Sequence, residues 1–581
     1  MRLLIAEIFT ILGAITVIVL AVTAGVLLYL RMRAKIVPRK TLLEADFETE
    51  YVECLPLDRL ARLVIGKAPR LLDAVAALAK ASEDERVTML VAKVGTSGMK
   101  LAKIQEIRDA VIRFREKGKK AIVYAETFGE FGPGNSAYYL ATAFDRIYLQ
   151  PSGSVSLTGL GVKTPFLRDL LMKAGIEPRL AHRKEYKSAA YLFTESQYNE
   201  PHREADQAVL ESLMSQFVDG IARSRGFTPQ QVLSLVKKGP FSATNALREK
   251  LVDELAYWDQ VCEAAKKEVG KDSRPLSLLE YLKRAGHPYS GRRKIALIYG
   301  VGPIIRGKSR WTPLGSQVMG SKTVAESFRQ AVKDKSVKAI IFRINSPGGS
   351  YVASDVVWRE ILRAREEGKP VIVSMSEVAG SGGYFVAAAA DKIIAQPATI
   401  TGSIGVVGGK MVTSEMWNKI GIHWGELYTH GNAGLWSSTQ NYSAEQWEQV
   451  QGWLDAIYTD FVTKVAQGRK LDLDRVHEIA KGRIWSGKDA RDIGLVDELG
   501  GFEEAVRAAK ASAGIGEEEK VGLRAFPAKR ALWKRLIFGR SERSEAGDAV
   551  GLGLPERGLE IFPPDPFQPF GVLQMTDRRV E

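Results

Sequence analysis

Short apolar runs alternate with helical stripes of hydrophobic residues over most of the chain. In the second half, Val337–Ile344, Pro370–Met375 and Lys392–Ala395 are aliphatic runs typical of buried strands. Between the first two, Val352–Arg365 carries apolar residues at helical spacing, and Gly383–Ala390 also has a helical pattern. Alternation of strand and helix predicts parallel strands joined by right-handed crossovers, which is an α/β fold.

The two halves of the chain resemble each other. The segments Lys120–Val162 and Lys369–Val407 share the order of strand, glycine-containing turn and helix. With a constant offset of 246 residues, identical residues fall together: Gly134 with Gly380, Tyr138 with Tyr384, Asp145 with Asp391, and Gln150-Pro151 with Gln396-Pro397. Two copies of ~200 residues are too few and too long for a solenoid. The duplication therefore predicts two tandem domains, at 41–285 and 286–515, and a tail with little packed structure at 516–581.

Residues 1–40 have a different pattern. The run Ile8–Leu30 is apolar and carries no formal charge. As a helix it would be about 35 Å long, enough to cross a hydrocarbon core of ~30 Å. A cleaved signal peptide has an apolar region of only about 7–15 residues. The pattern predicts an N-terminal anchor held in membrane lipid by one transmembrane helix at about 8–30.

Composition and charge exclude several classes of function. Lys and Arg number 82 against 68 Asp and Glu, and the basic residues are scattered, so a nucleic-acid partner is not expected. Two cysteines exclude a disulfide scaffold. The six histidines show no metal-binding spacing, so we expect neither a metal nor another cofactor.

One serine has the setting of a nucleophile. Ser381 follows a predicted strand, lies in the glycine-rich segment Ala379–Gly383 and begins a predicted helix. Glycines permit a sharp turn, and free N–H groups at a helix N-terminus can stabilise an oxyanion. An ordinary helix N-cap is the commoner role for such a serine. A second turn, Asn345–Gly349, follows the strand Val337–Ile344 and offers further bare backbone amides.

The two copies differ at these motifs. The first copy has Asn135 at the position of Ser381, and it lacks the Pro-Gly-Gly turn. The reverse holds for a candidate base, because Lys187, in the first-copy motif Glu185–Ala190, aligns near Ala433. One copy thus keeps the serine and the other keeps the lysine, which suits a degenerate active site in the first copy.

A nucleophilic serine needs a base, and the residues leave two choices open. Histidine is the usual one, and His423, His430 and His477 follow Ser381 without a distinctive motif. Lys187 is the other choice. The ordinary lysine pKa is about 10.4, so a base that works at pH 7 needs its pKa lowered by about three units. Burial in an apolar groove has this effect because it penalises the ammonium form.

Four motifs together resemble the signal peptide peptidase A (SppA) family in its long, duplicated form. They are Asn345–Ser350, Ala379–Phe385, Thr401–Val406 and Glu185–Ala190. The resemblance covers roughly residues 41–515. It implies two tandem crotonase/Clp-protease-like α/β domains and a homotetramer. It also implies a serine endopeptidase that cleaves apolar peptides such as released signal peptides, without a metal or cofactor.

The resemblance further implies a role for each site residue. These roles are nucleophile for Ser381, general base for Lys187, a hydrogen bond to that lysine for Ser403, and an oxyanion hole for the Gly382 amide together with Gly348 and Gly349 of the Pro-Gly-Gly turn.

Two other functions stay open. An esterase-type Ser-His-Asp hydrolase would use Ser381 with a downstream histidine, but its Gly-x-Ser-x-Gly elbow needs glycine where Ala379 stands. A crotonase-like fold could also hold an acyl thioester or a partner protein without proteolysis.

The side of the membrane is indicated in two conflicting ways. Basic residues follow the apolar run at Arg31, Arg33, Lys35, Arg39 and Lys40, and the positive-inside rule then places the large domain in the cytoplasm. The family resemblance implies a single-pass protein of the cytoplasmic (inner) membrane whose catalytic part lies outside the cytoplasm. We expect this second arrangement.

Overall fold

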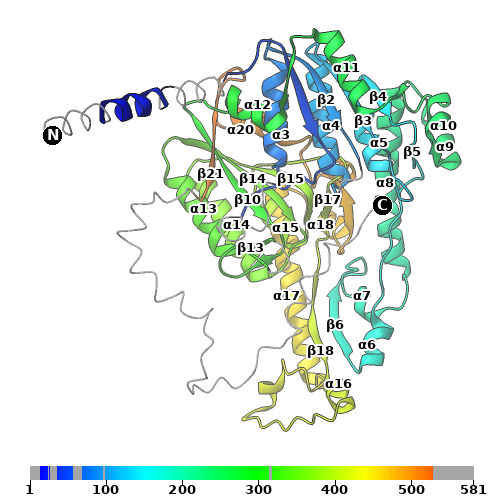
Figure 1. Ribbon diagram of the computed structural model, residues 1–581. Helices are drawn as coiled ribbons and strands as arrows, with labels where there is room; N and C mark the ends of the chain where they lie inside the picture. Colours follow the sequence, from blue (N-terminus) through cyan, green and yellow to red (C-terminus); the bar gives the residue numbers. More distant parts are fainter. Residues whose placement is uncertain are drawn as a thin grey trace, which may run out of the picture.

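The structure is a computed structural model that describes residues 13–23, 25, 36–56, 68–95, 98–312 and 317–527. Two mostly parallel β-sheets, one from each half of the chain, lie next to each other with helices on their faces (Figure 1). An extension leads away from the sheets and contains β6, β18, α6 and α16 (Figure 1). The α/β architecture predicted from the sequence is confirmed.

The first sheet has six parallel strands in the order β8-β4-β3-β2-β1-β9. Nearly every residue of β2 and β3 is buried, because helices cover the sheet, and these strands are accordingly almost continuous apolar runs. The strands are β1 (Thr41–Asp46), β2 (Val87–Lys93), β3 (Lys120–Ala125), β4 (Arg146–Leu149), β8 (Glu254–Leu255) and β9 (Arg274–Ser277).

The second sheet has eight strands, in the order β19-β17-β15-β14-β10-β21, with β16 beside β15 and β20 beside β16. All pairs are parallel except β17–β19, which is antiparallel. The strands are β10 (Lys294–Val301), β14 (Val337–Ser346), β15 (Val371–Gly380), β16 (Lys392–Ala395), β17 (Ile400–Gly402), β19 (Ile484–Ser486), β20 (Glu498–Leu499) and β21 (Gly522–Phe526).

The helices of the two halves follow the same order. Those of the first half are α3 (Leu71–Ser82), α4 (Leu101–Glu116), α5 (Asn135–Ala141), α6 (Arg168–Ala174), α7 (Tyr191–Thr194), α8 (Glu200–Arg225), α9 (Pro229–Lys238), α10 (Ala243–Arg248), α11 (Trp258–Val269) and α12 (Leu278–Ala285). Those of the second half are α13 (Ser321–Lys333), α14 (Tyr351–Glu366), α15 (Gly382–Ala387), α16 (Ser414–Lys419), the 3-10 turn Gly431–Gly434, α17 (Ala444–Arg469), α18 (Leu473–Ile479), α19 (Gly487–Asp492) and α20 (Phe502–Ser512).

Shorter ladders complete the fold. β5 (Ser154–Val155) pairs antiparallel with β7 (Phe241–Ser242), and β13 (Gln317–Gly320) lies between β11 (Ile304–Ile305) and β12 (Arg310–Trp311). The ladder that matters most for the site is antiparallel and joins β6 (Glu177–Arg183) of the first half to β18 (Val406–Val412) of the second.

The predicted elements of the second half are present, and the structure extends two of the strands: β14 continues past Ile344 to Ser346, and β15 is extended further. The helix predicted at Val352–Arg365 is α14, and the Ser350 side chain caps it by accepting from the Ala353 N–H at 3.3 Å. The strand predicted to end at Met375 continues to Gly380 because its second part pairs with β17. β15 therefore delivers the chain directly to Ser381.

Two expectations from the sequence differ from the structure or lie outside it. The low-structure tail was expected from residue 516, but β21 pairs with β10 and closes that edge of the second sheet as far as Phe526. Phe526 of β21 is buried in the hydrophobic core of the second half, which explains why this segment packs. Within the described residues no helix has the length and apolarity to cross a bilayer. Within the predicted span at 8–30, residues 13–23 and 25 are described and are helical, whereas 8–12, 24 and 26–30 lie outside the described residues.

A buried ion cluster joins the two halves. Arg343 of β14 is fully buried, and its guanidinium lies 2.9 Å from Glu53 Oε2 and 2.7 Å from Glu106 Oε2. Both carboxylates belong to the first half and are buried as well. Arg343 also donates to Ser374 Oγ at 2.9 Å, and Glu106 accepts from the Phe502 N–H at 2.8 Å. Because each charge is paired, the cluster holds the halves in one fixed orientation.

Replacing Arg343 with methionine would leave two buried carboxylates without their cation. We expect Arg343→Met to lower the free energy of unfolding by about 3–5 kcal/mol, measured by denaturant unfolding of the full chain in detergent. Arg359→Met is the matched control, because Arg359 pairs with Glu366 on the surface and should change stability little. Equal effects of the two substitutions would show that the buried cluster has no special importance.

Candidate functional site

The β6–β18 ladder brings the two halves of the site together. Val406 to Val412 pair in register with Arg183 to Glu177, so the chain leaving β6 turns back beside the end of β17. Lys187 lies on that returning segment and is 4% exposed. Ser381 follows β15, and Ser403 follows the neighbouring strand β17. Residues far apart in the sequence thus meet at the carboxyl ends of adjacent strands.

The lysine amine lies among three oxygen atoms. Lys187 Nζ is 3.0 Å from Ser381 Oγ, 3.0 Å from Ser403 Oγ and 2.9 Å from Ser403 O. The Ser403 carbonyl can only accept, and the Ser403 hydroxyl can accept a second N–H. A neutral amine has two N–H groups and one lone pair, so its lone pair is left to face the Ser381 hydroxyl.

Burial dominates the electrostatics of this lysine. Burial lowers the pKa of Lys187 from its usual range to about 7, because the ammonium form loses its hydration. Its three described hydrogen-bond partners are neutral oxygens. A substantial fraction of the Lys187 amine is therefore neutral near pH 7 and can accept a proton, whereas an exposed lysine is almost entirely protonated at this pH.

Ser381 is held in a strained backbone conformation. Its φ is +54° and its ψ is −121°, a region that non-glycine residues seldom occupy. The Ser381 N–H donates to Gly402 O at 2.9 Å, which fixes the turn against β17. Ser381 stands at the N-cap of α15, but its side chain makes no capping hydrogen bond. The hydroxyl points to Lys187 instead, so the ordinary N-cap role is excluded.

Two backbone amides beside the serine are candidates for an oxyanion hole. Gly382 is the first residue of α15, and no hydrogen bond from its N–H or from that of Gly349 is present among the described residues. The family resemblance implies that Gly348 contributes to the oxyanion hole, but its N–H donates to Ser346 Oγ at 3.2 Å. A Cβ at Gly348, where φ is +101°, would lie 2.6 Å from the Gly382 nitrogen, so only glycine fits this approach.

A small cavity of about 140 Å³ opens at Ser381 and Lys187. Apart from the glycines, Lys187 and Ser381, its lining is mostly apolar and comes from α14, α15, β18 and α17. These side chains are Tyr351, Phe385, Val406, Val407, Ile457 and Phe461. No sequence pattern marked these side chains or Ser346 as part of a site, although Ser346, Phe385 and Val406 lie inside the motifs around Ser381 and Ser403.

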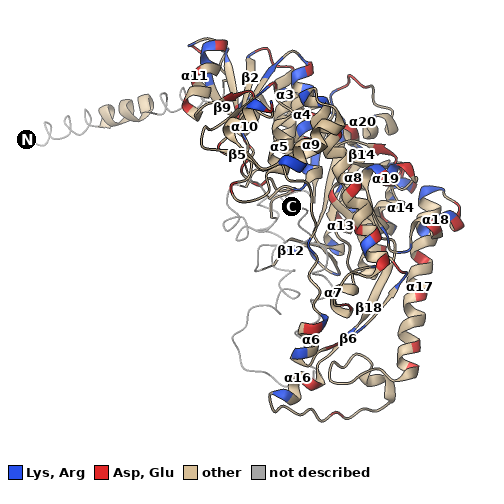
Figure 2. Cartoon of the chain, turned by 90° about the vertical axis from the view of Figure 1, so that its right-hand side faces the viewer, with Lys and Arg blue, Asp and Glu red and all other residues tan. Residues whose placement is uncertain are grey.

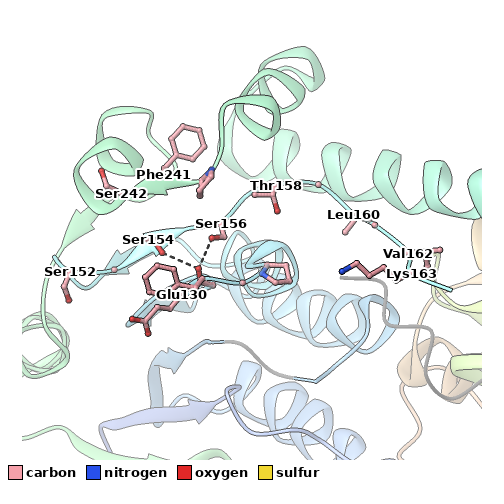
Figure 3. A pocket seen from close by; sticks show the side chains of 18 residues that line it. Glu130, Ser152, Ser154, Ser156, Thr158, Leu160, Val162, Lys163, Phe241 and Ser242 are labelled. Carbon is pink, nitrogen blue, oxygen red and sulfur yellow. Dashed lines mark hydrogen bonds between the residues drawn. The ribbon is translucent and has the colours of Figure 1, made fainter. Parts of the chain in front are cut away.

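The position in the first half that corresponds to Ser381 is Asn135, and its side chain binds backbone groups. The Asn135 side chain accepts from the Thr158 N–H at 3.0 Å and donates to Gly159 O at 2.8 Å. The asparagine amide thereby holds the loop that corresponds to Ser403 and its neighbours. A second cavity, of about 1120 Å³, lies on this side of the first half and is lined by Gly129–Pro133 and Thr158–Lys163, among other residues (Figure 3).

Two of the three histidines considered as bases have other side-chain contacts. His423 Nδ1 lies 3.2 Å from Asn418 Oδ1, and the His477 ring faces Tyr458 at 6.0 Å between centroids. Among the described hydrogen bonds, the partner of Ser381 Oγ is Lys187.

The depressed lysine pKa predicts a dependence of stability on pH. Between about pH 7 and pH 10.4 the unfolded chain holds a proton on Lys187 that the folded chain lacks, so stability rises with pH across this window. We expect Lys187→Met to stabilise the protein by a few kcal/mol at pH 7, at about 1.4 kcal/mol per unit of pKa shift, and by progressively less toward pH 10. Denaturant unfolding at several pH values measures this, with Lys173→Met in the exposed helix α6 as the control. A difference that stays constant from pH 7 to pH 10 would contradict the buried neutral amine.

Comparisons with known proteins place the chain in a peptidase family. Peptidase family S49 matches the chain twice, at residues 113–272 and 363–516. The chain is 32% identical over 453 residues to the chloroplastic serine protease SPPA of Arabidopsis thaliana, which covers 76% of this chain and 66% of the plant protein. It is 34% identical over 450 residues to Protease 4 of Salmonella typhi, covering 75% of this chain and 71% of that protein.

A third relative gives the same result. Protease 4 of Haemophilus influenzae is 32% identical over 474 residues, which cover 78% of this chain and 75% of that protein. The two family matches fall one in each half of the chain, as the internal duplication requires. The chain therefore belongs to peptidase family S49 and is an SppA-type serine peptidase.

Proposed function

We propose that this chain is an endopeptidase that cleaves apolar peptides, such as released signal peptides, with Ser381 as nucleophile and Lys187 as general base. The observation that carries the proposal is the 3.0 Å approach of a buried amine to the hydroxyl of a strained serine. A lysine whose pKa is lowered to about 7 is a competent base near neutral pH. Ser403 holds the amine so that its lone pair faces Ser381.

The reaction proceeds through an acyl-enzyme. Lys187 Nζ takes the proton from Ser381 Oγ while that oxygen bonds to the peptide carbonyl carbon. The Lys187 ammonium then gives the proton to the departing amine nitrogen as the C–N bond breaks. A water molecule replaces the amine, loses its proton to Lys187 and attacks the ester carbonyl, which releases the new carboxyl end and restores Ser381.

Negative charge that develops on the carbonyl oxygen needs donors at a fixed place. The amides of Gly382 and Gly349 are our candidates, because a Cβ built on Gly382 lies 3.3 Å from the Gly349 nitrogen, so the two amides are close neighbours. Gly348 acts indirectly: its own N–H is bound to Ser346, and its lack of a side chain lets the turn approach Gly382.

The substrate class follows from the cavity and from the lysine. The walls from Tyr351, Phe385 and Phe461 favour apolar side chains. An acidic substrate side chain in this cavity would stabilise the ammonium form of Lys187 and weaken the base. We therefore assign apolar peptide segments to the site.

The proposed dyad predicts which substitutions abolish turnover and how activity varies with pH. Ser381→Ala and Lys187→Met should each lower kcat at least about a thousandfold toward short apolar peptides. Wild-type activity should rise through an apparent pKa of about 7 and then level off, because only neutral Lys187 accepts the proton.

The controls for this assay separate the proposal from its alternatives. Lys184→Met, three residues from the proposed base, and His423→Asn and His477→Asn should keep activity within a few-fold of the wild type. Loss of activity in a histidine variant with retention in Lys187→Met would favour the esterase-type hydrolase. A binding protein without proteolysis would show no turnover in any variant.

We further propose that the run Ile8–Leu30 anchors the chain in the cytoplasmic membrane as a single transmembrane helix, with the catalytic part outside the cytoplasm. The apolar length of the run supports the anchor. The family resemblance supports the side of the membrane and also a homotetramer.

Membrane attachment can be tested on the intact chain. We expect the full chain to stay with membranes after an alkaline carbonate wash, and a chain that lacks residues 1–38 to be released, because the apolar run is then gone. Protease added outside intact spheroplasts should degrade the catalytic part. Release of the full chain by the wash would contradict the anchor, and protection from external protease would contradict the orientation.

A further inference from the structure

A short loop of the second half lies against Lys187. It comprises residues 480–483 and connects α18 to β19. The Tyr186 N–H donates to Lys481 O at 3.1 Å, so the loop binds the backbone directly before the proposed base. A Cβ at Gly482, where φ is +85°, would lie 2.5 Å from the Lys187 nitrogen. Because only glycine permits this approach, the loop forms one wall of the space in which the lysine is buried.

The same loop holds the residue that contacts the lysine amine. The Ser403 N–H donates to Arg483 O at 2.7 Å, and the Gly482 N–H donates to Ile404 O at 2.8 Å. Ser403 has a φ of +52°, where few residues other than glycine are found, so such bonds are needed to keep its backbone in place. The loop therefore binds both the lysine segment, through Tyr186, and the residue whose oxygens the amine contacts.

The Arg483 side chain reaches across to the first half. Its guanidinium carbon lies 5.0 Å from the centroid of the Tyr186 ring and 4.9 Å from that of the Trp485 ring. Its Nη1 donates to Glu204 Oε1 of α8 at 2.6 Å, and Glu204 Oε2 accepts from the Tyr186 hydroxyl at 2.7 Å. A flat guanidinium can stack on a ring and pair with a carboxylate at the same time, so Tyr186 is held on its face and at its hydroxyl.

Charge alone does not distinguish this contact from its surroundings. Both α8 and α18 carry acidic and basic residues (Figure 2). Lys481 also pairs with a residue of the first half, Glu185, at 3.3 Å, but both of these side chains are more than 40% exposed. Exposed pairs of this kind contribute little. The Arg483 side chain is only 19% exposed and is held by stacking as well as by its ion pair.

The other charged side chains near Lys187 along the chain are engaged elsewhere. Arg183 pairs with Asp455 of α17, and Lys184 Nζ lies over the Tyr458 ring. The pKa of Lys187 is lowered by burial. The contacts that keep this segment packed therefore decide how readily the amine loses its proton.

We propose that Arg483 is a positioning residue that keeps the Lys187 amine buried beside Ser381. Its carbonyl binds Ser403 and its side chain binds Tyr186, so one residue fixes both sides of the space that the amine occupies. The described lining of the cavity at Ser381 does not include Arg483, so it acts through its neighbours and not on the substrate. This inference rests on the proposed function, because it gives Arg483 a part in the use of Lys187 as the base.

Competitive acetylation measures the pKa of the Lys187 amine without any need for turnover. Full-length chains with Ser381→Ala, which cannot form an acyl-serine, are compared with and without Arg483→Met. They are labelled in detergent with trace acetic anhydride at several pH values, and the peptide that contains Lys187 is quantified by mass spectrometry. We expect an apparent pKa of about 7 in the parent chain. With Arg483→Met it should be at least about one unit higher, because water then reaches the ammonium form.

Kinetics on chains that retain Ser381 give the second measurement. Arg483→Met should lower kcat toward apolar peptides about tenfold to a hundredfold, leave KM within about twofold, and move the rise of activity to higher pH. Arg483→Lys keeps the charge but not the flat guanidinium, so it should recover only part of the activity. Arg475→Met is the matched control, because Arg475 pairs with Glu478 on the exposed side of α18 and should change neither the pKa nor kcat.

The outcomes separate this inference from the proposed function. A pKa that stays at about 7 in Arg483→Met would overturn the inference and leave the proposed base intact, as would a lower kcat with an unchanged pH profile. A pKa near the ordinary value of about 10.4 in the parent chain, or full activity in Lys187→Met, would overturn the proposed function itself. If Arg483→Met does not fold, Tyr186→Phe decides, because it removes only the hydroxyl that binds Glu204 and should raise the pKa of Lys187 by a smaller amount.

Discussion

A buried amine with neutral oxygen partners is the interaction on which this site depends. Lys187 Nζ is surrounded by oxygen atoms of Ser381 and Ser403, and burial lowers its pKa to about 7. A carboxylate nearby would favour the ammonium form and remove the basic lone pair. Most of the lining of the cavity is therefore constrained to be apolar.

Burial of Lys187 requires both halves of the chain. The β6–β18 ladder carries the lysine to the second half, and two glycines make room for it there. A Cβ at Gly482 would lie 2.5 Å from the Lys187 backbone nitrogen, and one at Gly405 would lie 3.2 Å from its Cδ. The Arg343 cluster holds the halves in one orientation, so the distance between the amine and the serine hydroxyl is fixed by packing.

The two similar halves of the chain contribute different parts of the site. The second half keeps the strained serine turn, whereas in the first half the Asn135 side chain binds the backbone of its own loop. The first half contributes the lysine, and its helices α4 and α8 contact the second half at Ala398 and Ser486. The corresponding side of the first half carries a cavity of about 1120 Å³.

The α/β class, the duplication and the motifs around Ser381 could be predicted from the residues alone, because strand–helix alternation and self-similarity are local properties of the chain. It also limited the bases to Lys187 and three histidines, but the residues alone left that choice open. Only the tertiary structure brought together Lys187 and Ser381, which are 194 residues apart, and only it revealed the burial that lowers the lysine pKa. The physical reason is that a pKa and a distance depend on what surrounds a side chain, and here those surroundings come from both halves of the fold.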